Sequence, residues 1–397
     1  MSDSPFVSTS ARFGRRIGML STYAPKICGL ATFSAALERE LRALGNTVEV
    51  VRLDDGDWVE PTSRAQPSVV AEIKNGDPFS VRNGGFALSR CDVAIVQHEF
   101  GIFGGTDGDE VLDILRAIRV PTIVVLHTVP LAPTSHQRFV LEAVAMLADS
   151  VVVMTEAARL RLVSTYDVDR NKPLTIISHG AIVPDSIDAR AVGSAGHQHP
   201  PQLLTWGLLG PGKGIEHVVD ALAMLREVYL EPRYTVAGVT HPKVMARDGD
   251  QYRQMLIRRS RQLGLSASVS FDDTYRSVAT LTRFIASSEI VILPYDSRDQ
   301  ATSGVLVDAV ATGRPVIATA FPHAVELLAS GAGIVVPQGD SEAMADAIRA
   351  LTCDRQLLAT TAAEARRIAP SLSWSAIAAQ YASLADRLLE TVEALAS

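Results

Sequence analysis

Apolar residues along this chain gather in short runs, and each run is followed by a polar loop and then by a segment with helical spacing. The run Arg16–Ser21 (RIGMLS) comes first, and Ala31–Leu44 then carries apolar residues three and four positions apart before Gly45. A third run covers Asn46–Leu53. Buried parallel strands read as continuous apolar runs, and helices commonly end at a glycine. The pattern therefore predicts an opening strand, helix and parallel strand.

The same alternation continues through the first half of the chain. Residues 54–90 show no clear pattern, and we expect loops with some short elements there. Beyond them the apolar runs predict strands at 91–97, 121–126, 150–154 and 174–178. Residues 184–201 then lose all periodicity and are rich in Pro, Gly, Ser and His, as linkers commonly are. We therefore expect an N-terminal domain over residues 1–185 and a linker over 186–201.

A second alternation of strands and helices begins after the linker. Its apolar runs predict strands at 202–207, 234–238, 269–271, 289–294, 315–318 and 333–336. Strands that alternate with helices form doubly wound parallel sheets. The fold class is therefore α/β, with two Rossmann-like domains that face a cleft. The second domain is expected over residues 202–372, and a separate helix over 373–397.

Residues 296–319 form a candidate ligand site within the second domain. A polar loop follows the strand at 289–294, and a helix then opens at Ser303 and Gly304. A serine can cap a helix, and a glycine lets a ligand approach the backbone closely. The free N–H groups of such a first turn suit an anion such as a diphosphate. Asp308 lies one turn further on the same face. The alternative is a buried strand–helix–strand unit with an ordinary cap.

The segment 207–214 (GLLGPGKG) is a second candidate, because it joins a strand to a helix and ends in a lysine. Gly212 and Lys213 at a helix N-terminus would form a phosphate cradle with an added point charge. The segment nearly matches a nucleotide-triphosphatase P-loop. Gly214, however, occupies the position where that motif needs Ser or Thr to bind Mg²⁺. A tight turn without a ligand is the structural alternative.

Composition and charge narrow the class of protein. A chain of 397 residues is long for a single core, so two domains are expected. The net charge is −7, with lysine and arginine scattered, which argues against nucleic acid or an anionic membrane as the main partner. Three distant cysteines form neither a disulfide framework nor a zinc site and suit a reducing cytoplasm. We find no secretory signal and no apolar run that could cross a bilayer.

Several segments together resemble one enzyme family. The stretches WGLLGPGKGIEHVVDAL and DAVATGRPVIAT are similar to the donor-binding motifs of the retaining glycosyltransferases with the GT-B fold, in the large family that handles sucrose and mannose (glycosyltransferase family 4). STYAPKICGLATFSAAL is similar to that family's first loop and helix, with Gly29 in the glycine position. VVLHT, which contains His127, and ISHGAIV resemble its active-site segments. The resemblance runs from about residue 16 to the end.

This chain departs from the family at three positions. Leu208 replaces an arginine, so Lys213 is the only fixed cation in its loop. Gln300 and Asp308 replace two glutamates, of which the family's first contacts the donor sugar and its second the ribose. Glutamine can still bond hydroxyl groups, and aspartate can still accept from a ribose with a shorter reach. Asp299 could take part of the lost acidic role.

The resemblance implies a set of roles. Lys213 and the turn at Ser303 and Gly304 would stabilise the departing diphosphate, while His127 and Gln300 would orient the sugar. The final helix would pack back on the N-terminal domain. His127 at a strand end also has a purely structural reading. His98 and Glu99 follow another strand and are candidates to bind the acceptor. With His127 they lack metal-ligand spacing within one element, so no metal site is expected.

The sequence as a whole predicts an enzyme. It would transfer a hexose from a nucleotide sugar, GDP-mannose first and UDP-glucose second, to a carbohydrate or other hydroxyl acceptor. The configuration at the sugar would be retained, and neither a metal nor a permanently bound cofactor would be needed. A nucleotide-sugar binding protein without activity remains an alternative, because both acidic positions are altered. A P-loop phosphotransferase is the other alternative, and the oligomeric state is left open.

Overall fold

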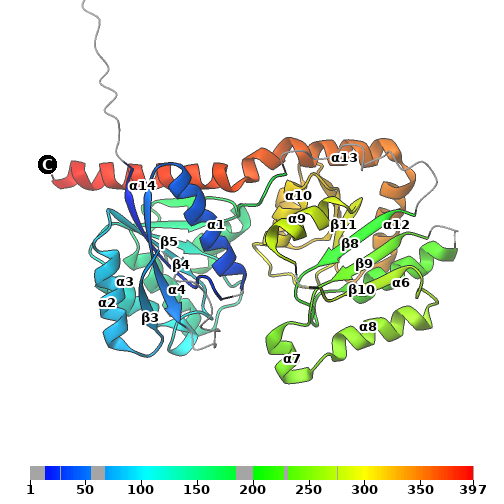
Figure 1. Ribbon diagram of the computed structural model, residues 1–397, viewed down its shortest axis with the longest axis horizontal. Helices are drawn as coiled ribbons and strands as arrows, with labels where there is room; N and C mark the ends of the chain where they lie inside the picture. Colours follow the sequence, from blue (N-terminus) through cyan, green and yellow to red (C-terminus); the bar gives the residue numbers. More distant parts are fainter. Residues whose placement is uncertain are drawn as a thin grey trace, which may run out of the picture.

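The computed structural model describes residues 14–26, 28–54, 68–184, 200–227, 231–274 and 276–396, and it consists of two α/β domains (Figure 1). The first contains a parallel sheet of seven strands in the order β3-β2-β1-β4-β5-β6-β7. The second contains a parallel sheet of six strands in the order β10-β9-β8-β11-β12-β13. In each sheet the chain starts near the middle and adds strands outward to both sides, which is doubly wound topology. The predicted fold class is confirmed.

The strands and helices of the first domain alternate along the chain. Its strands are β1 (Arg16–Ser21), β2 (Thr47–Asp54), β3 (Val69–Lys74), β4 (Val93–His98), β5 (Thr122–Leu126), β6 (Ser150–Val153) and β7 (Leu174–Ile176). Its helices are α1 (Gly29–Ala43), α2 (Pro78–Leu88), α3 (Val111–Ala117), α4 (Ser135–Leu147) and α5 (Glu156–Thr165), with a 3-10 turn η1 (Thr106–Gly108).

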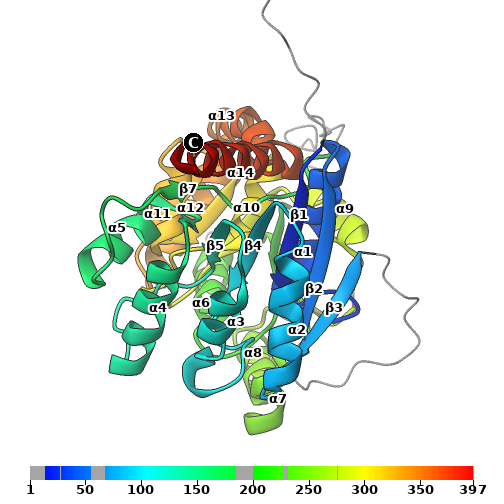
Figure 2. The same ribbon diagram turned by 90° about the vertical axis from the view of Figure 1, so that its left-hand side faces the viewer.

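The central strands of this sheet are apolar on both faces because helices cover both. Every residue of β4 is buried. Its Val96 packs in a cluster with residues of α2, α3 and α4, whereas Ile95 packs with residues of α1. Figure 2 shows α2, α3 and α4 on one side of the sheet and α14 across the other. Successive side chains of a strand point to opposite faces, so one apolar run supplies two cores.

The second domain repeats this arrangement. Its strands are β8 (Gln202–Trp206), β9 (Arg233–Ala237), β10 (Val269–Asp272), β11 (Ile290–Leu293), β12 (Val316–Thr319) and β13 (Gly333–Val336). Its helices are α6 (Ile215–Glu227), α7 (Pro242–Asp248), α8 (Gln251–Gln262), α9 (Val278–Ala286), α10 (Gly304–Ala311), α11 (Pro322–Leu328), α12 (Ser341–Cys353) and α13 (Arg355–Ile368). One core lies between the sheet and α6, α8 and α12, and the other between the sheet and α9, α10 and α11.

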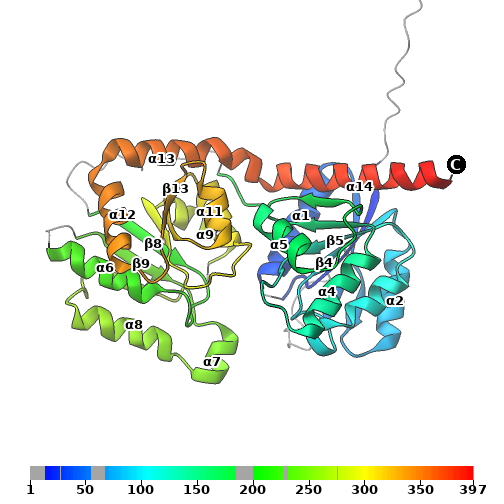
Figure 3. The ribbon, with the colours of Figure 1, turned by 180° about the vertical axis from the view of Figure 1, so that it is seen from behind.

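The last helix of the chain returns to the first domain. After the turn η3 (Ala369–Leu372), α14 (Trp374–Ala396) lies along α1, as Figures 1 and 3 show from opposite sides. Tyr381 and Leu384 of α14 share a buried cluster with Leu37 of α1. The N–H of Trp374 donates to Ala181 O at 3.1 Å. In the part of the chain that the structure describes, no helix combines the length and apolar character needed to cross a bilayer.

The structure differs from the sequence prediction over residues 54–90. A strand, β3, and a helix, α2, stand where loops with short elements were expected. The strand lies at the edge of its sheet and carries exposed Glu72 and Lys74, while α2 exposes Phe79 and Phe86, so neither shows a clean apolar period. Residues 55–67 of this stretch and 186–199 of the expected linker lie outside the described residues.

Candidate functional site

Loops that follow the strands of the two sheets meet across the domain boundary. Thr155 comes directly after β6, and its hydroxyl donates to Ala301 O at 2.9 Å. A Cβ atom at Gly304 would lie 2.9 Å from His179 Nε2, so the two segments approach closely there. Each of these residues lies on the carboxyl side of a strand. The carboxyl edges of the two sheets therefore face each other, and doubly wound proteins bind their ligands at such edges.

Three histidines lie at the carboxyl edge of the first sheet. His98 ends β4, His127 follows β5 and His179 comes after β7. Burial lowers the pKa of His98 to about 4 and that of His179 to about 4. Burial, together with the neighbouring histidines, lowers the pKa of His127 to about 3. All three imidazoles are therefore neutral near pH 7 and can form hydrogen bonds without adding charge.

His127 is held in one orientation by a buried amide and an aromatic ring. Gln97 Oε1 lies 2.7 Å from His127 Nε2, and the Phe33 ring packs edge-on against the imidazole at 4.9 Å between centroids. With an oxygen facing Nε2, that nitrogen carries the proton and Nδ1 is the acceptor. Among the described residues Nδ1 has no hydrogen-bond partner. This tautomer can accept a hydrogen bond from a hydroxyl group, as the proposed contact with a sugar requires.

His98, which the sequence suggests as an acceptor-binding residue, lies beneath the surface. Its side chain is fully buried, and neither ring nitrogen has a partner within the described part of the chain. The rings of Phe100 and Phe103 pack against it at centroid distances of 5.1 and 6.1 Å. Both ring nitrogens are thus buried without a partner in the described structure, and the acceptor role of His98 stays a prediction.

Glu99 is better placed than His98 to contact a ligand between the domains. Its carboxylate accepts from Thr128 Oγ1 at 2.5 Å, and burial raises its pKa. The positive charge of Lys243, on α7 of the second domain, lowers the pKa of Glu99.

Gly29, which the sequence suggests for donor binding, is an exposed residue at the start of α1.

The loop between β8 and α6 presents a lysine beside an aromatic ring. Lys213 Nζ lies 4.4 Å from the centroid of the Tyr295 ring, within the range of a cation–π contact. No carboxylate among the described residues forms an ion pair with it, and burial lowers its pKa. Gly212, one residue earlier, is exposed at the tip of the loop. An unpaired cation that is partly removed from water is stabilised by an anionic ligand.

Gly214 admits no side chain. Its φ is +63°, and an added Cβ would lie 1.8 Å from Pro294 O. A serine or threonine here would therefore require the strand end at Pro294 to move. A P-loop needs that hydroxyl to bind Mg²⁺, so the geometry of this turn disfavours the phosphotransferase alternative.

The N-terminus of α10 lies close to this lysine. Ser303 caps the helix with its hydroxyl, and its own N–H donates to His323 Nδ1 at 2.8 Å. The Tyr295 hydroxyl lies beside the Ser303 side chain, so one aromatic residue connects the helix start to Lys213. The N–H of Gly304, in the first turn, has no acceptor among the described residues. A helix N-terminus with unpaired N–H groups next to a cation suits a phosphate.

Asp308 lies one helical turn beyond Gly304 on α10. Burial raises the pKa of its carboxyl from 3.8 to about 7. No residue in the described ranges forms a hydrogen bond with this carboxylate, although the side chain keeps part of its surface exposed. A carboxyl group with a strongly shifted pKa and no partner is typical of a ligand site.

Asp299 and Gln300, which the sequence suggests for donor binding, are neighbours in the loop between β11 and α10 but differ in their contacts. The Gln300 side chain is half-buried and has no hydrogen-bond partner among the described residues. Asp299 Oδ1, in contrast, lies 2.5 Å from Arg161 Nη1 of the first domain, and Asp299 O accepts from the same nitrogen at 3.0 Å. Arg161 thus pairs with one oxygen of this carboxylate, whose side chain remains 52% exposed, and the donor role of Asp299 stays a prediction.

One group of side chains has the composition of a metal site. Ligand atoms of Glu216, His217 and Asp296 lie within 4.8 Å of one another. The hydroxyl of Tyr252 donates to Glu216 Oε2 at 2.6 Å, and His217 Nε2 lies 3.4 Å from Asp296 Oδ1. These contacts already account for the proximity of the group, and we assign no metal to it.

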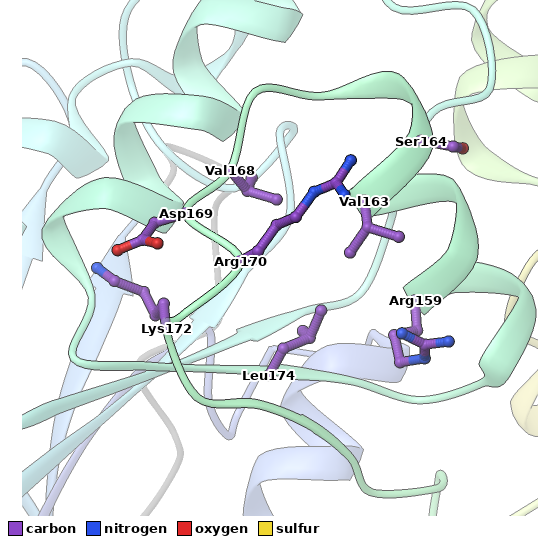
Figure 4. A pocket seen from close by; sticks show the side chains of 8 residues that line it. All are labelled: Arg159, Val163, Ser164, Val168, Asp169, Arg170, Lys172 and Leu174. Carbon is purple, nitrogen blue, oxygen red and sulfur yellow. The ribbon is translucent and has the colours of Figure 1, made fainter.

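A depression of about 600 Å³ elsewhere on the first domain is not part of this site (Figure 4). It lies where α5 ends and β7 begins, so it opens at the amino edge of the sheet. The ammonium of Lys172, on its rim, donates to Ala145 O at 2.8 Å and to Met146 O at 2.7 Å. The lysine is therefore committed to the end of α4, not to a ligand.

Several residues of the site are absent from the sequence prediction. Tyr295 and His323 each come shortly after a strand of the second sheet, so an inspection of every strand end would have found them. Gln97 lies within an apolar strand, and Arg161 lies within a helix. Nothing in the spacing of apolar residues distinguishes these two positions.

Comparison with known proteins finds similarity to glycosyltransferases. The family model described as "Glycosyl transferases group 1" matches residues 200–354, which covers most of the second domain. A D-inositol 3-phosphate glycosyltransferase from Corynebacterium glutamicum (strain R) is 28% identical over 245 residues, 60% of this chain and 57% of that protein. A phosphatidyl-myo-inositol mannosyltransferase from Mycobacterium leprae (strain TN) is 26% identical over 246 residues, 58% of this chain and 59% of that protein. The chain thus matches somewhat more than half the length of these relatives.

Solved structures extend the similarity of fold to both domains. The crystal structure of HepE from Anabaena in complex with UDP superposes with a TM-score of 0.71 at 19% identity, over 94% of this chain and 100% of that chain. The complex of HepE with UDP-glucose gives a TM-score of 0.65 at 18% identity, over 96% and 100%. At these identities the comparison establishes the architecture, two Rossmann-like domains of the GT-B type.

Proposed function

We propose that this chain is a glycosyltransferase of the GT-B fold, which transfers a hexose from a nucleotide sugar to a hydroxyl acceptor and retains the anomeric configuration. One observation carries the proposal. The unpaired ammonium of Lys213 and the N-terminus of α10 lie on either side of Tyr295, at the carboxyl edge of the second sheet. A cation and free helix N–H groups together suit a diphosphate.

The proposed donor is a nucleoside diphosphate hexose. The HepE complexes with UDP and UDP-glucose support a uridine nucleotide, whereas the relative named a mannosyltransferase supports GDP-mannose. Both donors present the same diphosphate to Lys213 and α10. The proposed acceptor is a hydroxyl group of a carbohydrate or polyol, in keeping with the inositol compounds that both relatives' names contain.

In the proposed reaction the bond between the anomeric carbon and the diphosphate breaks as the acceptor oxygen attacks. Negative charge then grows on the departing phosphate oxygen. Lys213 and the N–H groups at the start of α10 would meet that charge, which lowers the energy of the transition state. The departing phosphate, on the same face as the acceptor, would take the acceptor's proton, so the new bond forms with retention.

Other residues would orient the two substrates. Gln300 would bond hydroxyl groups of the hexose, and Asp308 would accept a hydrogen bond from the ribose. His127 would use its free Nδ1 to accept from a sugar hydroxyl, since Gln97 holds its other nitrogen. Glu99 would contact the acceptor. The reaction as proposed involves no resident metal or cofactor.

A screen of nucleotide binding and turnover tests the proposal. Thermal unfolding is measured with GDP, UDP, ADP, GDP-mannose and UDP-glucose, and release of the diphosphate is then followed with the donor that stabilises best. A ligand at a hundred times its dissociation constant adds about 2.7 kcal/mol to stability, a shift of several degrees. We expect one base to stabilise the protein and its sugar to be turned over. If no nucleotide stabilises the chain, the proposal is wrong.

A second candidate function is nucleotide-sugar binding without transfer. The replacement of two family glutamates by Gln300 and Asp308 favours it. In that case the protein would bind the donor with the same residues but release no diphosphate with any acceptor or with water.

A further inference from the structure

Helix α5 of the first domain is capped by groups of the second domain. The carboxylate of Glu326, on α11, accepts from the backbone N–H of Glu156 at 2.8 Å and of Ala157 at 3.0 Å. The N-cap Thr155 accepts from Ala158 N with the same hydroxyl that donates to Ala301 O. Helix N-termini favour such acceptors and negative charge. The start of α5 is thus completed by the other domain.

Arg161, in the second turn of α5, makes the most extensive of these contacts. Its side chain is only 8% exposed. Nη1 donates to Val129 O at 2.8 Å within its own domain and to Asp299 O at 3.0 Å in the other, and it lies 2.5 Å from Asp299 Oδ1. A buried guanidinium is stable only when it is paired and hydrogen-bonded. Arg161 therefore holds both the backbone and the side chain of Asp299.

The loop that Arg161 holds belongs to the second domain by sequence but packs into the first. Ala301 is 7% exposed and is part of the hydrophobic cluster that α2, α3, α4 and α5 form against the first sheet. Gln300 lies between Asp299, which the ion pair fixes, and Ala301, which is fixed by burial and by the bond from Thr155. The position of the Gln300 backbone is therefore set by the first domain.

We propose that Arg161 is a positioning residue for hexosyl transfer, acting through the loop 296–302 on Gln300. This inference rests on the proposed function. The first domain would then orient the donor sugar, while Lys213 and α10 of the second domain hold the diphosphate. Displacement of a catalytic group by about 1 Å can cost up to about a hundredfold in rate. The fit of the sugar thus depends on contact between the domains, and the binding of the diphosphate does not.

The Arg161→Ala variant tests whether the first domain orients the sugar while the second binds the diphosphate. We expect kcat/KM with the nucleotide sugar to fall by about tenfold to a hundredfold. The dissociation constant of the bare nucleoside diphosphate should stay within about twofold of wild type, since no hydrogen bond or ion pair among the described residues joins the Arg161 side chain to Lys213 or α10. Arg161→Lys should recover part of the loss, because lysine keeps the charge without the planar geometry of the guanidinium.

Arg159→Ala is the matched control. Arg159 lies on the same helix and forms an ion pair with Glu156, also on α5, so its loss leaves the contact between the domains intact. Its kcat/KM should remain close to wild type. If both arginine variants lose activity equally, or if Arg161→Ala weakens binding of the bare diphosphate as much as it lowers turnover, Arg161 has only a structural role and the proposal fails.

Hydrogen exchange gives a readout that needs no substrate. The N–H of Leu131 donates to Asp299 Oδ2, and the N–H of Ser303 donates to His323 at the end of the same loop. The N–H of Leu131 should exchange faster in Arg161→Ala, whereas that of Ser303, in the turn that would bind the diphosphate, should stay unchanged. Neither should change in Arg159→Ala. Absence of turnover in wild type would refute the proposed function, but this measurement would still test the loop. Unchanged exchange at Leu131 in Arg161→Ala would overturn the positioning role. Asp299→Asn, which keeps the backbone bond, replaces Arg161→Ala if that variant does not fold.

Discussion

The two carboxyl edges that face each other in this protein differ in charge. The edge of the first sheet presents His127 and His179, whose lowered pKa values keep them neutral. The edge of the second sheet presents the unpaired ammonium of Lys213, the N-terminus of α10 and the carboxyl of Asp308 with its raised pKa. Similar topology thus carries neutral histidines and the carboxyl of Glu99 on one side, and a cation with a helix N-terminus suited to a diphosphate on the other.

This difference indicates which domain binds which part of the substrates in the proposed reaction. A diphosphate that gains charge as it departs needs fixed positive groups, and these lie on the second domain. A sugar and a hydroxyl acceptor need oriented hydrogen bonds, which neutral histidines can supply without attracting the phosphate to the wrong side. Variants that change one edge should therefore affect different steps from variants of the other.

Loss of Lys213 should have the largest effect. Lys213→Ala removes the only fixed cation of the β8–α6 loop, at a cost of roughly 1.5–3 kcal/mol in donor binding and more where charge develops. We expect the rate of transfer to fall at least about tenfold while the thermal unfolding temperature of the free protein changes little. Lys74→Ala, on the outer strand β3, is the control. Activity within about twofold of wild type would contradict the placement of the diphosphate at this edge.

Changes at Gln300 and Asp308 should separate donor sugar from nucleotide. Asp308→Ala should weaken binding of the bare nucleoside diphosphate by about 1.5–3 kcal/mol, because the ribose loses a charged acceptor. Gln300→Ala should leave that binding unchanged and lower turnover of the nucleotide sugar. Calorimetry with the diphosphate and a transfer assay distinguish the two effects. If neither variant alters either quantity, both residues serve only as scaffold.

The raised pKa of Asp308 predicts a smaller effect, on how thermal stability depends on pH. Burial raises this pKa to about 7, so the folded protein binds the proton more tightly than the unfolded chain does between about pH 4 and 7. Proton uptake therefore stabilises wild type as the pH falls, whereas Asp308→Asn has no such proton to bind. The variant should unfold at a higher temperature than wild type near pH 8, and the difference should shrink toward pH 4. A difference independent of pH would contradict a buried, unpaired carboxyl group.

Removal of metal should have the smallest effect. Since Lys213 and α10 would neutralise the diphosphate, we expect the rate of transfer in excess EDTA to stay within about twofold of the untreated enzyme. The test is informative because Glu216, His217 and Asp296 lie close enough together to hold a cation. Complete loss of activity that Mg²⁺ or Mn²⁺ restores would contradict the mechanism and point to that group.

Much of the fold could be predicted because buried parallel strands appear in the sequence as continuous apolar runs. The run at 91–97 predicted β4, and the run at 289–294 predicted β11, since both are buried on both faces. The strand β3 and the helix α2 could not be predicted in the same way. Each is partly exposed at the margin of its domain, and so its apolar spacing is weak.

The residues of the candidate site that lie in or beside loops after strands could be predicted from the sequence. Contacts that depend on packing between the domains could not. Lys213 lies in the loop between β8 and α6, and Ser303 and Gly304 lie where the loop after β11 enters α10; the topology alone brings such loops to one edge. The contact of Asp299 with Arg161, in contrast, joins residues from two domains. No local pattern encodes that pairing, so the sequence could not predict that Arg161 contacts Asp299.

The most direct test of the account is a crystal structure of the protein with bound nucleoside diphosphate and hexose. We expect diphosphate oxygens within about 3 Å of Lys213 Nζ and of the N–H groups at the start of α10, with the hexose beside Gln300. The carboxyl of Asp308 should then accept a hydrogen bond from the ribose. A diphosphate bound at the edge of the first sheet, or at the depression beside β7, would contradict the account.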